Sequence, residues 1–378
     1  MATGKVEVNN LNLGQGGIPE IERHLLYIGR TDKAELQGKV TRVNNMTNLD
    51  EVVTDDALGA NVKSAQLNGK QNWTGAIFGL ADGDSWEDAV DTANLTDSFE
   101  GICVVDVVTN KAEFIAMQDK AMQDKATELT SKLGRWVFFL AACAGIDADT
   151  QTWSEYETAM LALVKDVAAN MVTPVPMLNG NNVGVLGGRL CDRAVTVADS
   201  PMRVATGSLL GLGEMPVDSA GKPLEMSTIS ALADARYSLP QWYADMEGVY
   251  WTDATTLEAK GGDYQYLEYV RPVHKLNRRV RIKAIRRIAD RILNSTPPSI
   301  ELNRTYFSKD MRDMSKTTEI GGIPFPGEIM PPRDEDVSIQ WMSKTKVNIG
   351  LMVRPHNCPK HIVVNIGLDL SNPADSEA

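Results

Sequence analysis

The chain has 378 residues, of which 43% are apolar and 23% are charged, and its formal net charge is −12. This composition is that of a folded, soluble protein with two domains or one large one. No apolar run approaches the roughly 18 residues that a membrane span needs, and the N-terminus lacks a signal pattern, so we expect a chain made in the cytoplasm without membrane insertion. The four scattered cysteines predict no disulfide framework.

Charge is distributed unevenly along the chain. Residues 1–270 contain 20 basic and 38 acidic side chains, whereas residues 271–378 contain 18 and 12. Direct nucleic-acid coating needs a broad basic face, so this distribution favours self-association or a charged protein partner. Ordinary solvated surface with uneven sampling explains the same counts equally well.

The N-terminus is predicted to be a strand on a tether. Residues 5–13 alternate between polar and apolar, and the glycine-rich residues 14–17 and Pro19 follow them. A strand joined to the rest by so flexible a segment belongs to an arm and not to a core. Its apolar positions are Val6, Val8, Leu11 and Leu13.

The middle of the chain is predicted to be α/β. Compact apolar runs, the form of buried strands, alternate with helical patterns. A helix is expected near residues 110–133, and another follows Thr152, where Glu155 completes a capping box. The predicted strands are residues 24–29, 76–80, 101–108 and 136–144.

Residues 173–221 are rich in Gly, Pro and Asn and are predicted to form loops with brief strands, such as 183–186 and 209–212. Beyond them, residues 248–257 and 264–270 flank a Gly-Gly turn. They are expected to form a hairpin or two neighbouring strands.

A basic amphipathic helix is predicted from Pro272 to Leu293. Pro272 suits a first turn, and the Pro-Pro pair near residue 298 is expected to end the element. Its Lys and Arg cluster would attract a phosphate backbone or an acidic protein face, although snorkelling side chains on a surface helix have the same pattern. The net negative charge and the lack of interleaved aromatic residues favour a protein partner. The candidate residues are Lys275, Arg278, Arg279, Lys283, Arg286 and Arg287.

Three strands are predicted at the C-terminus, at residues 337–342, 346–354 and 361–370. A turn at residues 356–360 is expected to fold the last strand back on its neighbour. The last strand has two faces, because its apolar residues alternate with other residues. Its apolar face consists of Ile362, Val364, Ile366, Leu368 and Leu370.

No motif for chemistry is complete. Gly69-Lys70 is followed by Gln71, so a phosphate-binding loop fails, and the 14–17 segment does not join a strand to a helix. His356, Cys358 and His361 lack a fourth ligand and a standard spacing. We therefore expect no catalytic residue, no cofactor and no metal site.

The two chain ends, each predicted to form a lone strand, and four further segments resemble the sheath proteins of contractile phage tails. The segments are Glu22 to Gly29, Tyr250 to Leu257, the helix after Val270-Arg271 and the closing 346–370 hairpin. The chain is most similar to the short sheath proteins of Mu-like and P2-like phages and of phage-derived bacteriocins.

The resemblance implies a two-layer tail-sheath subunit, α/β in class. Its parts would be an N-terminal arm (1–20), a mixed-sheet α/β outer domain (21–268), an α+β inner domain with the basic helix (269–360) and a C-terminal strand arm and tail (361–378). Arms of neighbouring subunits would complete one another's sheets around an inner tube, and contraction would drive the tube through the cell envelope.

The partners that the resemblance implies are further copies in stacked hexameric rings, the tail tube protein, and the baseplate and tail terminator proteins, with no direct nucleic acid. The location would be the virion tail, after assembly in the host cytoplasm. Two alternatives remain open: an α/β enzyme of unidentified substrate, and another self-assembling tail or baseplate protein.

Overall fold

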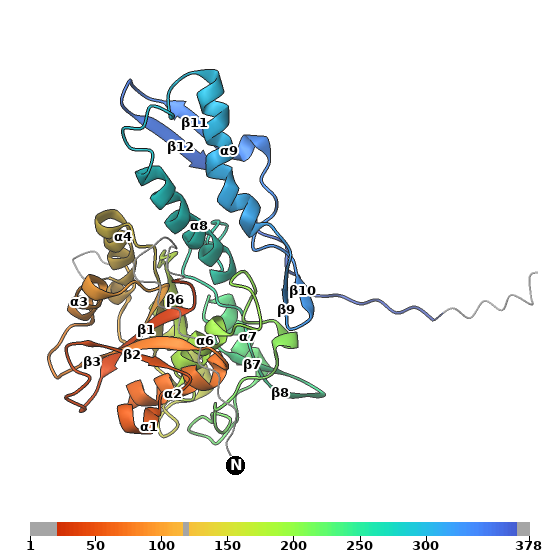
Figure 1. The fold of residues 1–378 in the computed structure, drawn as a ribbon. Helices are drawn as coiled ribbons and strands as arrows, with labels where there is room; N and C mark the ends of the chain where they lie inside the picture. Colours follow the sequence, from red (N-terminus) through yellow and green to blue (C-terminus); the bar gives the residue numbers. More distant parts are fainter. Residues whose placement is uncertain (1–20, 116–120, 369–378) are drawn as a thin grey trace, which may run out of the picture.

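The computed structural model describes residues 21–115 and 121–368. An α/β body holds the first two thirds of the chain, and a long projection of two helices and a small sheet rises from it (Figure 1). The predicted N-terminal strand, with Val6, Val8, Leu11 and Leu13, lies outside the described residues, as does Leu370.

A six-stranded sheet organises the body. The strand order is β2-β3-β1-β4-β5-β6, and every neighbouring pair is parallel except β2 with β3. The predicted α/β class is confirmed, and the edge strands β2 and β6 are additions to it. The strands are β1 His24–Arg30, β2 Val40–Asn44, β3 Thr74–Leu80, β4 Gly101–Val108, β5 Phe138–Cys143 and β6 Val172–Pro176.

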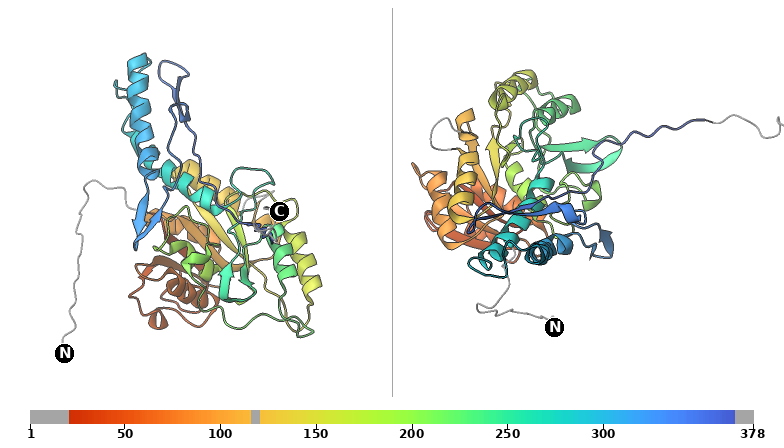
Figure 2. Two further views of the ribbon diagram at one scale, coloured as in Figure 1. Left: turned by 90° about the vertical axis from the view of Figure 1, so that its right-hand side faces the viewer. Right: turned by 90° about the horizontal axis from the view of Figure 1, so that it is seen from above.

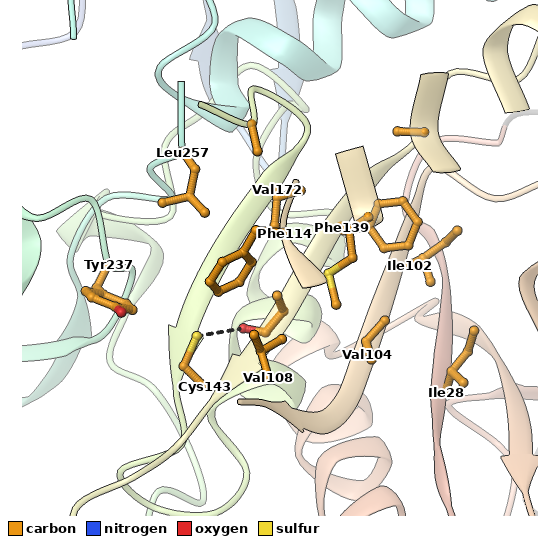
Figure 3. Close-up of a cluster of buried hydrophobic side chains, with 14 of the residues drawn as sticks. Ile28, Ile102, Val104, Val108, Phe114, Phe139, Cys143, Val172, Tyr237 and Leu257 are labelled. Carbon is orange, nitrogen blue, oxygen red and sulfur yellow. Dashed lines mark hydrogen bonds between the residues drawn. The ribbon is translucent and has the colours of Figure 1, made fainter. Parts of the chain in front are cut away.

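Helices cover both faces of this sheet, because each central strand is apolar on both sides. Ile28 and Leu26 of β1 face one core, shown with its neighbours in Figure 3, whereas Leu25 and Tyr27 face the other. The first core is covered by α3 Trp86–Thr96, α4 Met122–Leu133, α5 Trp153–Val164 and α7 Met226–Asp234. The second is covered by α1 Leu49–Val52, α2 Ala57–Gly69 and α6 Asn182–Cys191.

Two helix predictions can be compared directly with these elements. The capping box at α5 is present, with Thr152 and Glu155 bonded reciprocally. The helix expected over 110–133 is shorter: a 3₁₀ turn, η1 Lys111–Glu113, comes first, and α4 begins at Met122. Two further 3₁₀ turns are η2 Val204–Thr206 and η3 Asp334–Asp336.

The loop prediction for residues 173–221 was wrong at α6. This helix is fully buried and contains glycines that let its backbone approach α2 closely. A Cβ built on Gly184 would lie 1.9 Å from the carbonyl oxygen of Asn61, and one on Gly188 would lie 2.4 Å from that of Ala65. Tertiary packing therefore outweighs the low helix propensity of glycine here. Residues 209–212 form no strand.

The hairpin expected at 248–270 was partly wrong. Its first strand exists as β8 Met246–Trp251. This strand pairs with the segment before it, β7 Pro240–Tyr243, and not with the segment after it. Residues 264–270 are not a strand, because α8 (Leu267–Ile285) already begins there and Pro272 lies inside it. Leu267 and Val270 are buried in the second core, so the body itself anchors the first turn of α8.

The predicted end of the basic helix was also wrong. The Pro-Pro pair does not close the basic helix; it opens a new one, α9 Pro297–Met314, since proline lacks only an N–H that a first turn leaves unpaired. Helices α8 and α9 pack with the hairpin of β11 Val337–Trp341 and β12 Val347–Leu351, which stands beside α9 in Figure 2 (left). A small hairpin of β9 Thr318–Ile320 and β10 Ile323–Phe325 lies between α9 and β11 in the chain.

The last predicted strand does not fold back. Described residues 361–368 adopt no strand and form a single extended segment that leaves the body (Figures 1 and 2). Lys360 contacts Asp253 and Glu268 of the body, and residues 361–368 form no backbone hydrogen bond with the rest of the described chain. We call residues 361–368 the C-terminal arm.

Candidate functional site on helix α8

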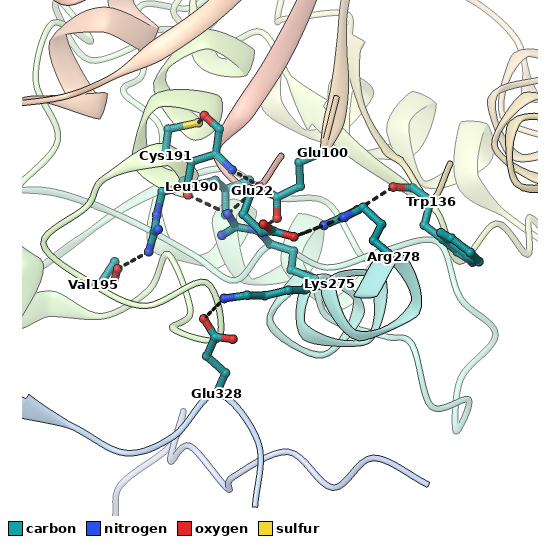
Figure 4. A network of polar contacts seen from close by, with 11 residues as sticks. Glu22, Glu100, Trp136, Leu190, Cys191, Val195, Lys275, Arg278 and Glu328 are labelled. Atoms are coloured by element: carbon teal, nitrogen blue, oxygen red, sulfur yellow. Dashed lines mark hydrogen bonds and ion pairs between the residues drawn. The ribbon is translucent and has the colours of Figure 1, made fainter. Parts of the chain in front are cut away.

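Four charged side chains follow one face of α8 and are buried. They recur at intervals of three and four residues, the spacing that places side chains on the same helix face. We call this set the charged face of α8; it consists of Glu268, Arg271, Lys275 and Arg278. Figure 4 shows Lys275 and Arg278 of this set together with the acidic residues Glu22, Glu100 and Glu328.

Arg271 holds the most deeply buried pair. Its Nε and a terminal nitrogen donate to the two Glu100 oxygens at 2.7 and 2.9 Å, and a further bond of 2.9 Å reaches the Leu190 carbonyl. The backbone N–H of Arg23 also donates to Glu100, at 2.6 Å. Burial by itself would raise the pKa of Glu100, but the Arg271 charge and these hydrogen bonds lower it to about 2. The pair is thus fully ionised at neutral pH.

Arg278 and Lys275 extend the same face. Arg278 donates to a carboxylate oxygen of Glu22 at 2.7 Å and to the Trp136 carbonyl at 3.0 Å. Lys275 donates to Glu328 at 2.6 Å, in the segment that leads to β11 (Figure 4). These contacts join the start of the described chain, the sheet and the projection to one helix.

The Lys360 side chain packs against the first turn of α8. Its ammonium contacts the carboxylates of Asp253 and Glu268, the latter at 2.7 Å, and lies 3.3 Å from the centroid of the Tyr266 ring. Burial, then the nearby Asp253 charge, raise the pKa of Glu268 to about 7, although Lys360 opposes this. The ammonium gains from two carboxylates, so the Lys360 pKa is raised despite its burial.

The structure separates the six predicted basic residues into two groups. Lys275 and Arg278 are buried in ion pairs within the chain, and their charged groups do not face outward. Four others lie further along the helix and its C-terminal turn. Lys283 pairs with Asp310, Arg287 pairs with Asp290, Arg279 is half-buried and Arg286 is exposed.

The predicted linking residues of the C-terminal arm are exposed wherever the structure describes them. Exposure is 70% for Ile362, 73% for Val364, 92% for Ile366 and 83% for Leu368. Backbone hydrogen bonds from this arm to the rest of the described chain are absent. Large apolar side chains in this state are unusual for a free surface and are typical of a segment that has a partner elsewhere.

Sequence reasoning missed the partners of the charged face. Glu22 and Glu100 each stand immediately before or near the start of a buried strand, where an acid next to apolar residues is a weak signal of a buried pair. Their partners on α8 are 256 and 171 residues away, a separation that no local pattern bridges. Lys360 was assigned only to a turn.

The described residues contain no group of three His, Cys, Asp or Glu side chains suited to a metal ion. His356 and Cys358 line a pocket of about 600 Å³ beside Lys360, the residue that precedes the C-terminal arm. Within the parts of the chain that are described, no helix is long and apolar enough to cross a membrane.

A parallel α/β body, a projection with a small hairpin and an exposed arm together define a contractile-sheath type of subunit. Comparison with known proteins agrees with this class. Residues 3–255 match the family model described as DUF2586, N-terminal domain, and residues 263–371 match DUF2586, C-terminal domain. The "Putative tail sheath protein" of Haemophilus phage HP1 (strain HP1c1) is 44% identical over 97% of this chain and 98% of its own length. The chain therefore belongs to the DUF2586 family of phage tail sheath proteins.

Solved structures share the fold at low sequence identity. A chain of the PVC extracellular contractile injection system sheath in its contracted state gives a TM-score of 0.60 at 13% identity, over 98% of both chains. A chain of the anti-feeding prophage baseplate gives 0.58 at 13%, over 97% of this chain and 100% of that one. The sheath tail protein of Desulfitobacterium hafniense gives 0.52 at 11%, over 93% and 96%.

Proposed function

We propose that this sheath protein polymerises around an inner tail tube by exchanging strands between subunits, and that its contraction drives the tube through the cell envelope. The chain acts as a structural element and not as an enzyme. The observation that carries this proposal is the C-terminal arm, whose apolar side chains are between 70% and 92% exposed.

An isolated extended segment leaves its backbone N–H and C=O groups without protein partners. Adding it to the edge of another subunit's sheet satisfies those groups and buries its apolar side chains at the same time. The predicted N-terminal strand with Val6, Val8, Leu11 and Leu13 would link subunits in the same way, as would Leu370, which follows the C-terminal arm in sequence.

The hairpin of β11 and β12 is a suitable acceptor. A two-stranded sheet is marginally stable in water, and each added strand provides further ladder hydrogen bonds and side-chain contacts. Its inner face already packs on α9 through Val337 and Ile339, which fixes its orientation. We therefore assign it to an inner layer near the tube, together with residues 269–360.

Basic residues at the far end of α8 are suited to contacts with the tube or with a neighbouring subunit. Arg286 is exposed and Arg279 is half-buried, whereas Lys283 and Arg287 are partly engaged by Asp310 and Asp290. Lys275 and Arg278 take this role only if contraction opens their buried pairs. The acidic body, residues 21–268, supplies a complementary face on the next subunit.

The remaining partners follow from the class: further copies in stacked hexameric rings, the tail tube protein, and baseplate and tail terminator proteins. Assembly would take place in the host cytoplasm and the product would be part of the virion tail. Energy would be stored in subunit interfaces, since the chain lacks a phosphate-binding loop.

Negative-stain electron microscopy of the purified chain, alone and co-expressed with its tube protein, tests the proposal. Full-length protein should form tubes or stacked rings. A variant whose residues 361–378 are replaced by a Gly/Ser segment of equal length should stay monomeric, with an unchanged melting temperature. Tubes of normal length from that variant would contradict strand linkage through this arm, and a full-length chain that never assembles with its tube would contradict the function.

A further inference from the structure

Each chain arm is attached to the body through a residue that is ion-paired to the same helix, α8. We call these residues, Glu22 and Lys360, the roots of the N-terminal and C-terminal arms. Glu22 lies at the start of the described chain, directly after the segment expected to form the N-terminal arm, and pairs with Arg278. Lys360 directly precedes the C-terminal arm and pairs with Glu268. Almost the whole chain separates these roots in sequence, whereas Glu268 and Arg278 are only about 15 Å apart along α8.

Each root has a second connection. The backbone N–H of Arg23 donates to Glu100, which Arg271 holds, so the N-terminal root is bonded to α8 both directly and through one carboxylate. At the other root, Lys360 also contacts Asp253 and the Tyr266 ring. Between them, Lys275 holds Glu328 at 2.6 Å.

Buried ion pairs of this kind resist separation. Opening one leaves a charge in an environment of low polarity without a partner, which costs far more than opening an exposed pair. A displacement of either root must therefore open a buried pair or move α8. Helix α8 is held along one face and is stiff over this length, so movement at one root is transmitted to the other.

We propose that α8 couples the two arms of a subunit, with Glu268, Arg271, Lys275 and Arg278 as the positioning residues. This inference depends on the proposed function, because the arms carry force only if they link neighbouring subunits. Force arriving on one arm would then pass along α8 to the other arm and largely bypass the six-stranded sheet. The ring-to-ring connection would depend on this helix more than on the body of the subunit.

Hydrogen exchange of the full-length monomer tests the coupling directly. Arg278→Gln cuts the N-terminal root. We expect backbone exchange to rise about fivefold or more at the distant N–H groups of Ala254 and Leu267, as energetically coupled sites do. These groups donate to Asp253 at 3.1 Å and to the Ala254 carbonyl at 3.0 Å, beside the carboxylates that hold Lys360. Lys360→Gln should raise exchange at residues 21–26 reciprocally. Arg281→Gln, exposed on the same helix and outside its charged face, is the matched control and should change neither segment.

A role confined to local stability gives a different result. Exchange would then rise only beside each substitution, with the distant root unchanged, and that outcome overturns the proposal. If Arg278→Gln does not fold, Lys360→Gln at the more exposed root decides the matter alone. Because the measurement uses monomers, a chain that forms no sheath would defeat the proposed function while coupling is still measured, and normal sheaths without coupling would defeat this inference only.

Discussion

The Arg271 guanidinium and the Glu100 carboxylate form a two-bond ion pair that is almost completely shielded from water, with 2% and 0% of the side chains exposed. This pair connects α8 to the segment that enters β4. Its environment makes each partner costly to leave alone, and this cost can be measured.

Removing one partner of this pair should destabilise the chain strongly. Arg271→Met leaves Glu100 as a buried, unpaired carboxylate, and we expect a loss of about 3–5 kcal/mol in the free energy of unfolding measured with urea. The double variant Arg271→Met with Glu100→Gln should recover most of it, because no charge remains buried. Arg304→Ala, which breaks an exposed pair with Glu301, should cost below about 1 kcal/mol.

Glu268 should make stability fall as pH rises. Its pKa is raised to about 7 in the fold from an ordinary value of 4.5, so the folded chain holds the proton more tightly than the unfolded chain. The associated stability is complete below about pH 4.5 and is lost as pH approaches 7. Thermal melting from pH 4.5 to 8 should show this slope, and Glu268→Gln should flatten it.

Glu100 contributes the opposite slope at lower pH. Its pKa of about 2 lies below the ordinary 4.5, so its stabilisation is present above pH 4.5 and is lost as pH falls toward 2. An unchanged acid limb in Glu100→Gln would contradict the assignment of this limb to the Arg271 pair.

Gly184 should not tolerate a side chain. In Gly184→Ala the added methyl would lie 1.9 Å from the Asn61 carbonyl oxygen, a backbone atom that cannot move aside without shifting α2. We expect a loss of roughly 3 kcal/mol or more, measured by urea unfolding. Gly350→Ala is the matched control: its nearest neighbour is the Ser338 hydroxyl, which can rotate, so the loss should stay below about 1 kcal/mol.

Charge on the apolar face of the C-terminal arm should separate folding from assembly. Ile366 is 92% exposed, so Ile366→Asp should change the free energy of unfolding by less than about 0.5 kcal/mol. Sheath formation, followed by electron microscopy and sedimentation, should be lost because a buried carboxylate would enter the acceptor sheet. Val363→Asp changes the other face of the arm and should form sheaths more readily than Ile366→Asp does. An equal loss of sheath formation in both variants would argue against a two-faced strand.

Arg286 is exposed and Arg279 is half-buried, and neither belongs to the buried charged face of α8, so both can be reversed without unfolding the chain. Arg279→Glu with Arg286→Glu should reduce assembly on the tube while the melting temperature stays near that of the parent chain. Lys39→Glu, an exposed change on the α/β body, serves as the control. Reversal of Arg278 is unsuitable for this purpose, because opposing Glu22 with a second buried acid would unfold the region.

Sequence periodicity predicted the central strands well, because these depend on local patterns of apolar residues. It also predicted a strand at residues 361–370, but the described residues 361–368 are extended and form no strand. It failed at α6, where three glycines suggested a loop and close packing against α2 required a helix. It failed at Pro297, where the same Pro-Pro pair can end one helix or begin the next.

The candidate site was predicted only in part. The basic residues of α8 were identified, yet a pattern of charges does not reveal which of them are neutralised inside the fold. Glu22 and Glu100 decide that for Arg278 and Arg271, and both are remote in sequence. The linking role of the arm residues stays a prediction; it came from alternating apolar residues in a segment with no apparent partner within its own chain.

The two edges of the large sheet restrict where strands can be added. On β6, Pro174 and Pro176 offer no N–H, and the outward carbonyls of Val172 and Pro174 already accept bonds from Leu257 and Ser238. On the other side, antiparallel β2 carries the exposed Arg42, a charged residue that discourages edge pairing. If subunits exchange strands as proposed, both edges of the larger sheet would be poor acceptors for a misplaced arm, and the part of the subunit that exchanges no strand would then contribute to the fidelity of assembly.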